Sequence, residues 1–253
     1  MTSPVFHHGH EDLHRVRPGE VLDVVGPEAR HAVTVRRLRA GEPLDLVDGH
    51  GTRVSCTFTT GEKDRMSVTV AAVHREEPPR PHLGLVQALA KGDRDLQAAE
   101  AATELGVTCV IPWQAERSIV RLRAERAART MAKWESTLNT AAKQSRRAHW
   151  PRLQPWVDTA GLAELIRSRP DTLWLVLHES AATRWSADDV AGWRGRAGVT
   201  VVVGPEGGIS DRERETLEAA GAHTVRLGDT VMRSSTAGPA ALAALGAVLG
   251  IWG

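Results

Sequence analysis

The first part of the chain alternates short apolar runs with turn residues. Four runs read as β-strands: Val21–Val25, Leu44–Val47, Arg53–Phe58 and Met66–Val73. Glycine-containing turns at Gly19, Asp48–Gly51 and Gly61 separate these runs. One helix is predicted around Glu28–Leu38. Short strands with a single helix predict a small β-barrel domain over residues 1–74.

The pattern changes after His74–His82, whose prolines and charges predict a linker over residues 75–82. Continuous apolar runs then alternate with helical periodicity. The runs are Leu83–Ala90, Val107–Ile111, Leu173–Leu177 and Val199–Val203, and the longest helical stretches are Asp93–Leu105 and Arg123–Arg147. Continuous apolar strands between helices predict a parallel sheet covered on both faces. The chain is therefore predicted to be an α/β protein, with its second domain over residues 83–253.

The carboxyl-terminal segment Thr236–Gly253 carries no charge over eighteen residues, which is about the lower limit for a membrane span. It is rich in alanine and glycine, contains Pro239 and has few large aliphatic residues. Small residues let other backbones approach closely. The segment is therefore predicted to be a helix in a core or at a subunit interface.

Composition excludes few functions. The chain has 253 residues, 42% of them hydrophobic and 25% charged, as in soluble globular proteins of one or two domains. The net charge of +1 does not indicate a nucleic-acid partner, but Arg117–Arg152 holds ten Lys or Arg residues and two acids. Such a stretch either neutralises phosphates or forms a solvated helix face, and the sequence leaves both open.

The two cysteines, Cys56 and Cys109, lie far apart and suggest neither a disulfide framework nor a metal site. They are predicted to be buried thiols in a reducing compartment. Met1–His10 lacks a basic start followed by an apolar stretch, so no secretory signal is visible. A cytoplasmic protein without a metal or a membrane partner is expected.

The strongest local signal is Val199–Glu213, which reads as a buried strand, a glycine-rich loop and a helix. Ser210 and Glu213 have the spacing of a capping box, which predicts a helix that starts near Asp211. Such loops at the carboxyl ends of parallel strands bind ligands. The chain lacks G-x-G-x-x-G and G-x-x-x-x-G-K-[ST], which argues against the usual dinucleotide and P-loop folds.

Two further strand ends extend this candidate site. A short strand ends at Leu227-Gly228, and a loop through Arg233 leads into the uncharged helix. The third strand ends at Leu177-His178-Glu179. Arg233 is either a surface ion-pairing residue or a cation that stabilises negative charge on a substrate.

Five motifs of this chain resemble motifs of one family and occur in the order that they have in that family. They are GPEGGIS at 204–210; Leu227-Gly228 with Val231-Met232-Arg233; Thr103–Val107 with Pro112 and Arg117-Ser118; Trp134, Ala142, Gln144, Arg147 and Pro151; and His31, Val35, Arg37 and Gly41. Together they cover nearly the whole chain, which resembles the ribosomal RNA small-subunit methyltransferase E family of the SPOUT, or trefoil-knot, methyltransferases. The family usually has Glu where this chain has Ser235, so a base cannot be placed there.

The resemblance implies a PUA-like RNA-binding β-barrel, followed by an α/β SPOUT domain with a carboxyl-terminal trefoil knot. It implies a homodimer and the cofactor S-adenosylmethionine. The cofactor would be held by Leu177, Val203, Gly204, Gly207, Gly208, Leu227, Gly228, Val231, Met232 and Arg233. The RNA contacts would be Arg37, Gln144, Arg146 and Arg147.

The implied reaction, in ribosomal RNA processing and ribosome biogenesis, methylates N3 of one uridine in the decoding region of 16S ribosomal RNA. Arg233 is expected to stabilise the negative charge that develops on the base. Glu206 and His178 are candidate general bases by position, but Glu206 is expected first of all to fix its loop by hydrogen bonds. Two other functions remain open: a related methyltransferase that acts on transfer RNA or a ribose 2′-hydroxyl, and a non-catalytic RNA-binding assembly factor.

Overall fold

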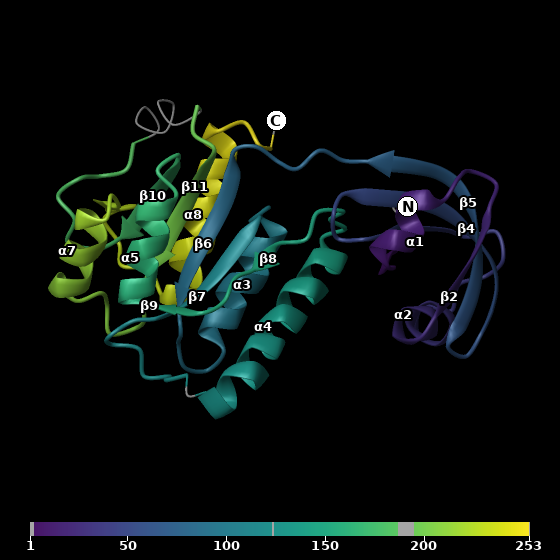
Figure 1. Cartoon of the computed structure of the whole chain (residues 1–253), viewed down its shortest axis with the longest axis horizontal. Coiled ribbons are helices and arrows are strands. Elements are labelled where there is room, and N and C mark those ends of the chain that lie inside the picture. Colours follow the sequence, from purple (N-terminus) through teal and green to yellow (C-terminus); the bar gives the residue numbers. More distant parts are fainter. Residues whose placement is uncertain (1–2, 123, 187–194, 253) are drawn as a thin grey trace. The chain divides into compact units, whose positions relative to one another are not determined.

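The structure is a computed structural model of the chain, and it describes residues 3–122, 124–186 and 195–252 (Figure 1). The chain divides into two compact units. The N-terminal unit comprises Met1–Pro78 and Ala142–Trp150, and the C-terminal unit comprises Pro79–Ala141 and Pro151–Gly253. The first is rich in strands and the second is α/β, which confirms the predicted fold class.

The N-terminal unit is built on a five-stranded sheet in the order β1-β3-β4-β5-β2. The strands are β1 Val5–His7, β2 Val21–Val25, β3 Pro43–Val47, β4 Thr52–Glu62 and β5 Arg65–Arg75. β1 pairs with β3 in parallel and the other neighbours are antiparallel. The long β4 and β5 bend (Figure 1), and their register shifts at Ser55/Cys56 and Phe58/Thr60, as β-bulges do. The four predicted strands are therefore confirmed.

The helices of this unit differ from the prediction. α1 (His10–Arg15) was not predicted, because six residues carry too little periodicity. The helix expected around Glu28–Leu38 is α2 (Pro27–Arg30), which continues as the π-helix η1 (His31–Val35). It ends earlier than expected, and Arg37 beyond it is left-handed with a φ of 55°.

The segment 142–150 belongs to the N-terminal unit, and no local pattern in the sequence predicts this. Lys143 Nζ lies 2.6 Å from Glu28 Oε1 in α2. Arg53 Nη2 in β4 donates to the carbonyl of Arg146 at 2.8 Å. These long-range polar contacts tie the segment to the small sheet.

The C-terminal unit holds a seven-stranded sheet in the order β12-β10-β11-β6-β7-β8, with β9 also on β7. The strands are β6 His82–Ala88, β7 Cys109–Gln114, β8 Arg152–Leu153, β9 Val157–Asp158, β10 Thr172–Leu177, β11 Gly198–Val203 and β12 His223–Val225. Every recorded pairing is parallel, as predicted. All these strands therefore end at the same edge of the sheet.

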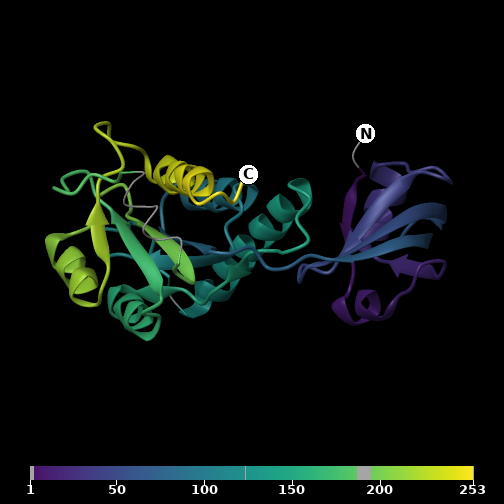
Figure 2. The ribbon, with the colours of Figure 1, turned by 90° about the horizontal axis from the view of Figure 1, so that it is seen from above.

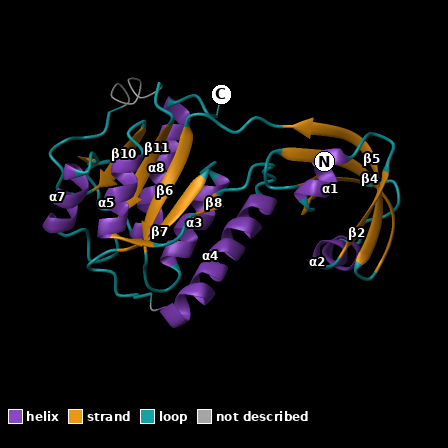
Figure 3. Ribbon diagram, in the orientation of Figure 1, coloured by secondary structure: helices purple, strands orange, loops and turns teal. Residues whose placement is uncertain are grey.

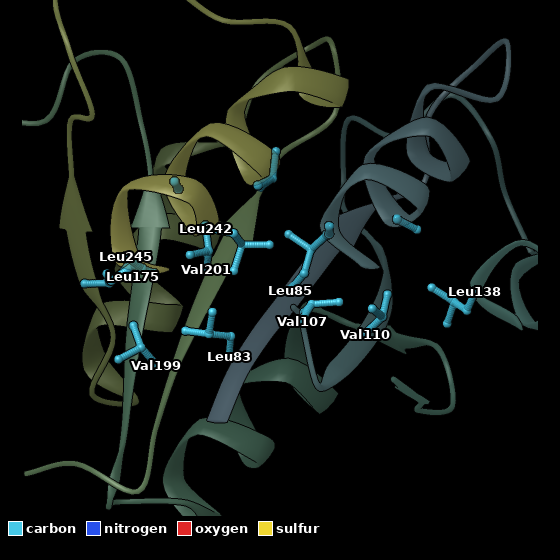
Figure 4. Packing of buried hydrophobic residues seen from close by; sticks show 14 of the residues in the cluster. Leu83, Leu85, Val107, Val110, Leu138, Leu175, Val199, Val201, Leu242 and Leu245 are labelled. Carbon is cyan, nitrogen blue, oxygen red and sulfur yellow. The ribbon is translucent and has the colours of Figure 1, made fainter. Parts of the chain in front are cut away.

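Helices cover both faces of this sheet (Figures 2 and 3). They are α3 Arg94–Glu104, α4 Ala124–Gln144, α5 Thr159–Ser168, α7 Asp211–Ala219 and α8 Ser234–Val248. On one face, Leu85 and Val201 pack with Leu242 of α8 (Figure 4). On the other face, Val202 packs in a cluster with Leu217 of α7. Arg123, where the predicted long helix begins, lies outside the described residues.

The uncharged helix predicted near the C-terminus is α8, and it packs against α3, β6 and β11. Leu242 and Leu245 are fully buried, and a Cβ at Gly238 would come within 2.9 Å of Leu85 Cδ1. The small residues therefore let this helix lie close to the sheet, and its role in a core is confirmed. Across the described ranges, no helix is long and apolar enough to cross a membrane.

A buried carboxylate, Glu213, joins three segments of this unit and is only 1% exposed. Its Oε1 accepts hydrogen bonds from the Glu116 backbone N–H and the Thr159 hydroxyl, each at 2.8 Å. Its Oε2 accepts from the Ser210 backbone N–H at 3.1 Å. The loop after β7, the start of α5 and the glycine loop before α7 are thereby fixed together. The predicted capping box and the start of α7 at Asp211 are confirmed.

Glu213→Ala is expected to lower the free energy of unfolding by about 2–4 kcal/mol, because it leaves buried donors without an acceptor. Denaturant titration measures this change. The matched control is Glu215→Ala, at an exposed position of the same helix, which is expected to change stability by less than about 0.5 kcal/mol. Equal effects of the two variants would contradict the assignment of Glu213 as a structural tie.

Candidate active site

A cleft of about 450 Å³ lies at the carboxyl ends of β10 and β11. Its lining comprises Arg94, Leu177–Glu179, Val203–Ile209, Val231–Ser234 and Ala237. A smaller hollow of about 80 Å³ shares part of this lining and adds Arg226–Gly228 and Thr230. Open parallel sheets bind ligands at this edge.

The structure brings the predicted cofactor residues together in these two hollows. The larger one is lined by Leu177, Val203, Gly204, Gly207, Gly208, Val231, Met232 and Arg233. Leu227 and Gly228 line the smaller one, together with Leu177, Val231 and Met232. The three loops predicted from separate strand ends therefore meet at one place.

The glycine loop is held in shape from within and from a neighbouring loop. A Cβ at Gly204 would lie 2.6 Å from Ile209 Cγ1, and Gly208 has a φ of 74°. Both positions therefore favour glycine. Arg117, in the loop after β7, donates from Nη1 to the Gly207 carbonyl at 3.1 Å.

Glu206 forms an ion pair that joins the glycine loop to the start of α3. Its Oε1 lies 3.1 Å from Nη1 of Arg94, the first residue of α3. The loop is also held by Arg117 and by the Glu213 hydrogen bonds. Arg94 was not predicted as a site residue. The available signal was its place just beyond β6, the strand beside β11.

Arg233 lies exposed at the N-terminus of α8 and lines the cleft. Within residues 3–122, 124–186 and 195–252, no ion pair is recorded for its guanidinium. The next residue, Ser234, is 7% exposed, and in the same ranges its hydroxyl lacks a hydrogen-bond partner. A helix N-terminus favours negative charge. This side of the cleft therefore favours an anionic group.

His178 lines both hollows, and its Nδ1 forms hydrogen bonds within the protein. The Ser180 backbone N–H lies 3.3 Å from Nδ1, and the Ser180 hydroxyl lies 2.9 Å from it. A backbone N–H can only donate, so Nδ1 is an acceptor and the neutral ring carries its proton on Nε2. His178 is therefore poorly suited to accept a proton from a substrate.

The predicted RNA contacts all belong to the N-terminal unit. Arg37, Gln144 and Arg146 are exposed, and Arg147 is partly buried. Burial lowers the pKa of Arg147 to about 10, so it keeps its charge at neutral pH. The basic stretch Arg117–Arg152 is divided between the two units after Ala141, so it does not belong to a single unit.

Several charged side chains of that stretch form hydrogen bonds or ion pairs with other parts of the protein. Arg117 donates to the glycine loop, and Arg121 donates to the carbonyls of Ala115 and Glu116. Lys133 pairs with Asp93 at 2.7 Å. These residues are therefore engaged in contacts within the protein.

Both cysteines are free thiols. Cys56 is buried as predicted, and burial raises its pKa to about 12. Cys109 is only partly buried.

Two family models match the chain. An RNA methyltransferase domain matches residues 76–246, and an RNA methyltransferase PUA domain matches residues 26–71. These matches follow the order of the predicted domains.

Relatives cover nearly the whole chain. The ribosomal RNA small subunit methyltransferase E of Mycobacterium bovis is 39% identical over 236 residues, which cover 92% of this chain and 89% of the relative. The enzyme of that name from Neisseria gonorrhoeae, solved bound to S-adenosyl methionine, has a TM-score of 0.84 at 28% identity, with 98% of each chain covered. The putative methyltransferase of Legionella pneumophila, solved with bound SAM, has a TM-score of 0.83 at 27% identity and the same coverage. The resemblance seen in the sequence is confirmed, and the chain belongs to the ribosomal RNA small subunit methyltransferase E family.

Proposed function

We propose that this protein transfers a methyl group from S-adenosylmethionine to N3 of one uridine in 16S ribosomal RNA. The observation that carries the proposal is the cleft in which three loops meet at the carboxyl edge of the parallel sheet. A relative with the same fold was solved with S-adenosyl methionine. The proposed substrate also implies a cytoplasmic location and a role in ribosome biogenesis.

The lining fits this cofactor. The cleft of about 450 Å³ has the size of a small-molecule site, and the smaller hollow beside it extends its lining. Leu177, Val203 and Met232 provide apolar contacts, and Gly228 leaves open space, because a Cβ there would meet nothing within 4 Å. The cofactor supplies a methyl group already activated by a positively charged sulfur. The protein therefore has to bind and orient the cofactor and the substrate base and to remove the proton from N3. This chemistry requires no metal.

The proton on N3 of uridine makes the reaction demanding. Removing it leaves negative charge on the O2 and O4 atoms of the base, and a preorganised cation lowers the barrier. We assign this role to Arg233, whose guanidinium lines the cleft and has no recorded ion pair in the part of the chain that the structure describes. The carboxylate of Glu206 lines the same cleft and is the proposed proton acceptor.

We propose that the N-terminal unit binds the RNA and that the C-terminal unit is the catalytic SPOUT domain. Arg37, Gln144, Arg146 and Arg147 all belong to the first unit, although Arg37 lies more than a hundred positions before the other three. Side chains cannot read the deep groove of A-form RNA, so recognition would use phosphates, shape and exposed bases. The dependence of RNA binding on salt concentration measures the phosphate contacts.

We also propose a homodimer that uses the outer face of α8. Leu242 and Leu245 are buried within the C-terminal unit, so they are not available to a partner. Thr236, Ala243 and Ala247 share the opposite helix face by their spacing and are partly or fully exposed. An uncharged face of this kind suits a second copy of the chain. Sedimentation equilibrium measures the oligomeric state.

The function is tested by mapping the methyl group. Small ribosomal subunits that lack the modification are incubated with the protein and the cofactor, and the RNA is analysed by mass spectrometry. One methyl group on N3 of a uridine in 16S ribosomal RNA is expected. A methyl group on a ribose 2′-oxygen or on transfer RNA would favour the related methyltransferase, and RNA binding without transfer would favour an assembly factor.

Gly228→Val is expected to weaken cofactor binding about tenfold or more while the fold stays intact, because the side chain enters space that the cofactor needs. Isothermal calorimetry measures the affinity. Gly195→Val is the matched control, since a Cβ at Gly195 also meets nothing within 4 Å but lies outside the cleft. Unchanged affinity in Gly228→Val would place the cofactor elsewhere.

Arg233→Ala is expected to slow methyl transfer on the order of a hundredfold, with little change in cofactor affinity, because it removes one preorganised cation. Single-turnover kinetics and calorimetry separate the two effects. If affinity falls and the single-turnover rate does not, Arg233 is a binding residue and the proposed role is wrong.

A further inference from the structure

Arg94 is the first residue of α3 and lines the cleft, directly after the loop that follows β6. The two residues before it have left-handed backbones, with φ of 63° at Gly92 and 58° at Asp93. Residues other than glycine adopt this conformation at a cost, and such strain persists only where surrounding contacts fix it. The path of the chain into Arg94 is therefore imposed by its neighbours.

Contacts on both sides hold this loop. The carbonyl of Asp93 accepts from the Gln97 N–H at 2.8 Å, and its Oδ1 lies 2.7 Å from Lys133 Nζ. Asp95, which is only 6% exposed, accepts from the Ala90 N–H at 3.3 Å. The backbone that leads into Arg94 is therefore held in place by these contacts.

The ion pair that Arg94 forms joins the start of α3 to the glycine loop. Arg94 Nη1 lies 3.1 Å from Oε1 of Glu206, and the two side chains are 44% and 25% exposed. For Oε2 of Glu206, the described part of the chain records no hydrogen bond. One carboxylate oxygen is thus anchored, and the other is left to meet a substrate.

We propose that Arg94 is the positioning residue that holds the Glu206 carboxylate ready to accept the proton from N3. The inference rests on the proposed function. In this step the N3–H bond breaks, its proton goes to Oε2 of Glu206 and its electron pair stays on N3. Arg94 keeps its own proton and charge throughout.

The geometry explains why Glu206 needs such a partner. Its long side chain comes from a loop in which the next two residues are Gly207 and Gly208. A reacting group that is misplaced by about 1 Å slows a reaction on the order of a hundredfold. The other acid in the lining, Glu179, is exposed, and the described residues show no ion pair to it. Glu206 is therefore the acid that the protein orients.

The test compares Arg94→Ala, Arg94→Lys, Glu206→Gln and the double variant Arg94→Ala/Glu206→Gln. Single-turnover transfer to unmethylated small subunits is measured, with cofactor and RNA affinities determined separately. Arg94→Ala is expected to slow transfer about tenfold with both affinities unchanged, and Arg94→Lys to restore most of the rate. Glu206→Gln is expected to slow transfer about a hundredfold or more, and the double variant to be no slower than Glu206→Gln.

Arg167→Ala is the matched control, because it removes another surface Arg–Glu pair, at 3.2 Å on α5. It is expected to leave the rate unchanged. The Arg94–Glu206 pair is partly exposed, so its loss is not expected to unfold the protein.

Several outcomes would overturn the inference. A double variant slowed by the product of the single effects would show that Arg94 acts independently of Glu206. Weaker RNA binding in Arg94→Ala, with a salt slope smaller by about one, would make Arg94 a phosphate contact. If Arg94→Ala transfers at the wild-type rate while Glu206→Gln is slow, the positioning role of Arg94 is wrong and the role of Glu206 stands. A wild-type rate in Glu206→Gln, or no transfer by the wild type, would instead refute the proposed chemistry itself.

Discussion

The hydrogen bonds to the buried Glu213 carboxylate are the constraint on which the site depends. A charge that is removed from water must be satisfied by donors, and Glu213 finds them in Glu116, Thr159 and Ser210. These donors lie in three segments that are distant in the sequence. Satisfying one charge therefore fixes the glycine loop, the loop after β7 and the start of α5 against one another.

The rest of the cleft builds on that fixed loop. Arg117 comes from the loop whose start Glu213 holds, and it donates to the Gly207 carbonyl. Glu206 lies at the centre of the same loop and pairs with Arg94 across the cleft. The glycine-loop backbone beside the proposed cofactor and the Glu206 carboxylate beside the proposed substrate are therefore positioned by the same loop. The three parallel strands β6, β10 and β11 bring these parts to the same edge of the sheet.

Local patterns in the sequence predicted the parts of the fold that depend on local physics. The apolar runs of the second unit became parallel strands, and the Ser210–Glu213 spacing became a capping box. The sequence did not predict the placement of 142–150 with the N-terminal unit, because that depends on long-range contacts such as Lys143–Glu28. β1 and β8 were missed because they are too short to show a period. For the site, strand ends predicted three loops, whereas Arg94 was missed because only tertiary packing pairs it with Glu206.

The central claim is that the Glu213 hydrogen bonds shape the glycine loop before any cofactor binds. Amide hydrogen exchange of Glu213→Gln and the wild type, both without cofactor, tests it most directly. Faster exchange is predicted at the amides of Glu116, Ser210 and Glu213, which this carboxylate and the Ser210 cap engage, and unchanged exchange in the strands of the N-terminal unit. Equal exchange of the loop amides in the two proteins would contradict the account.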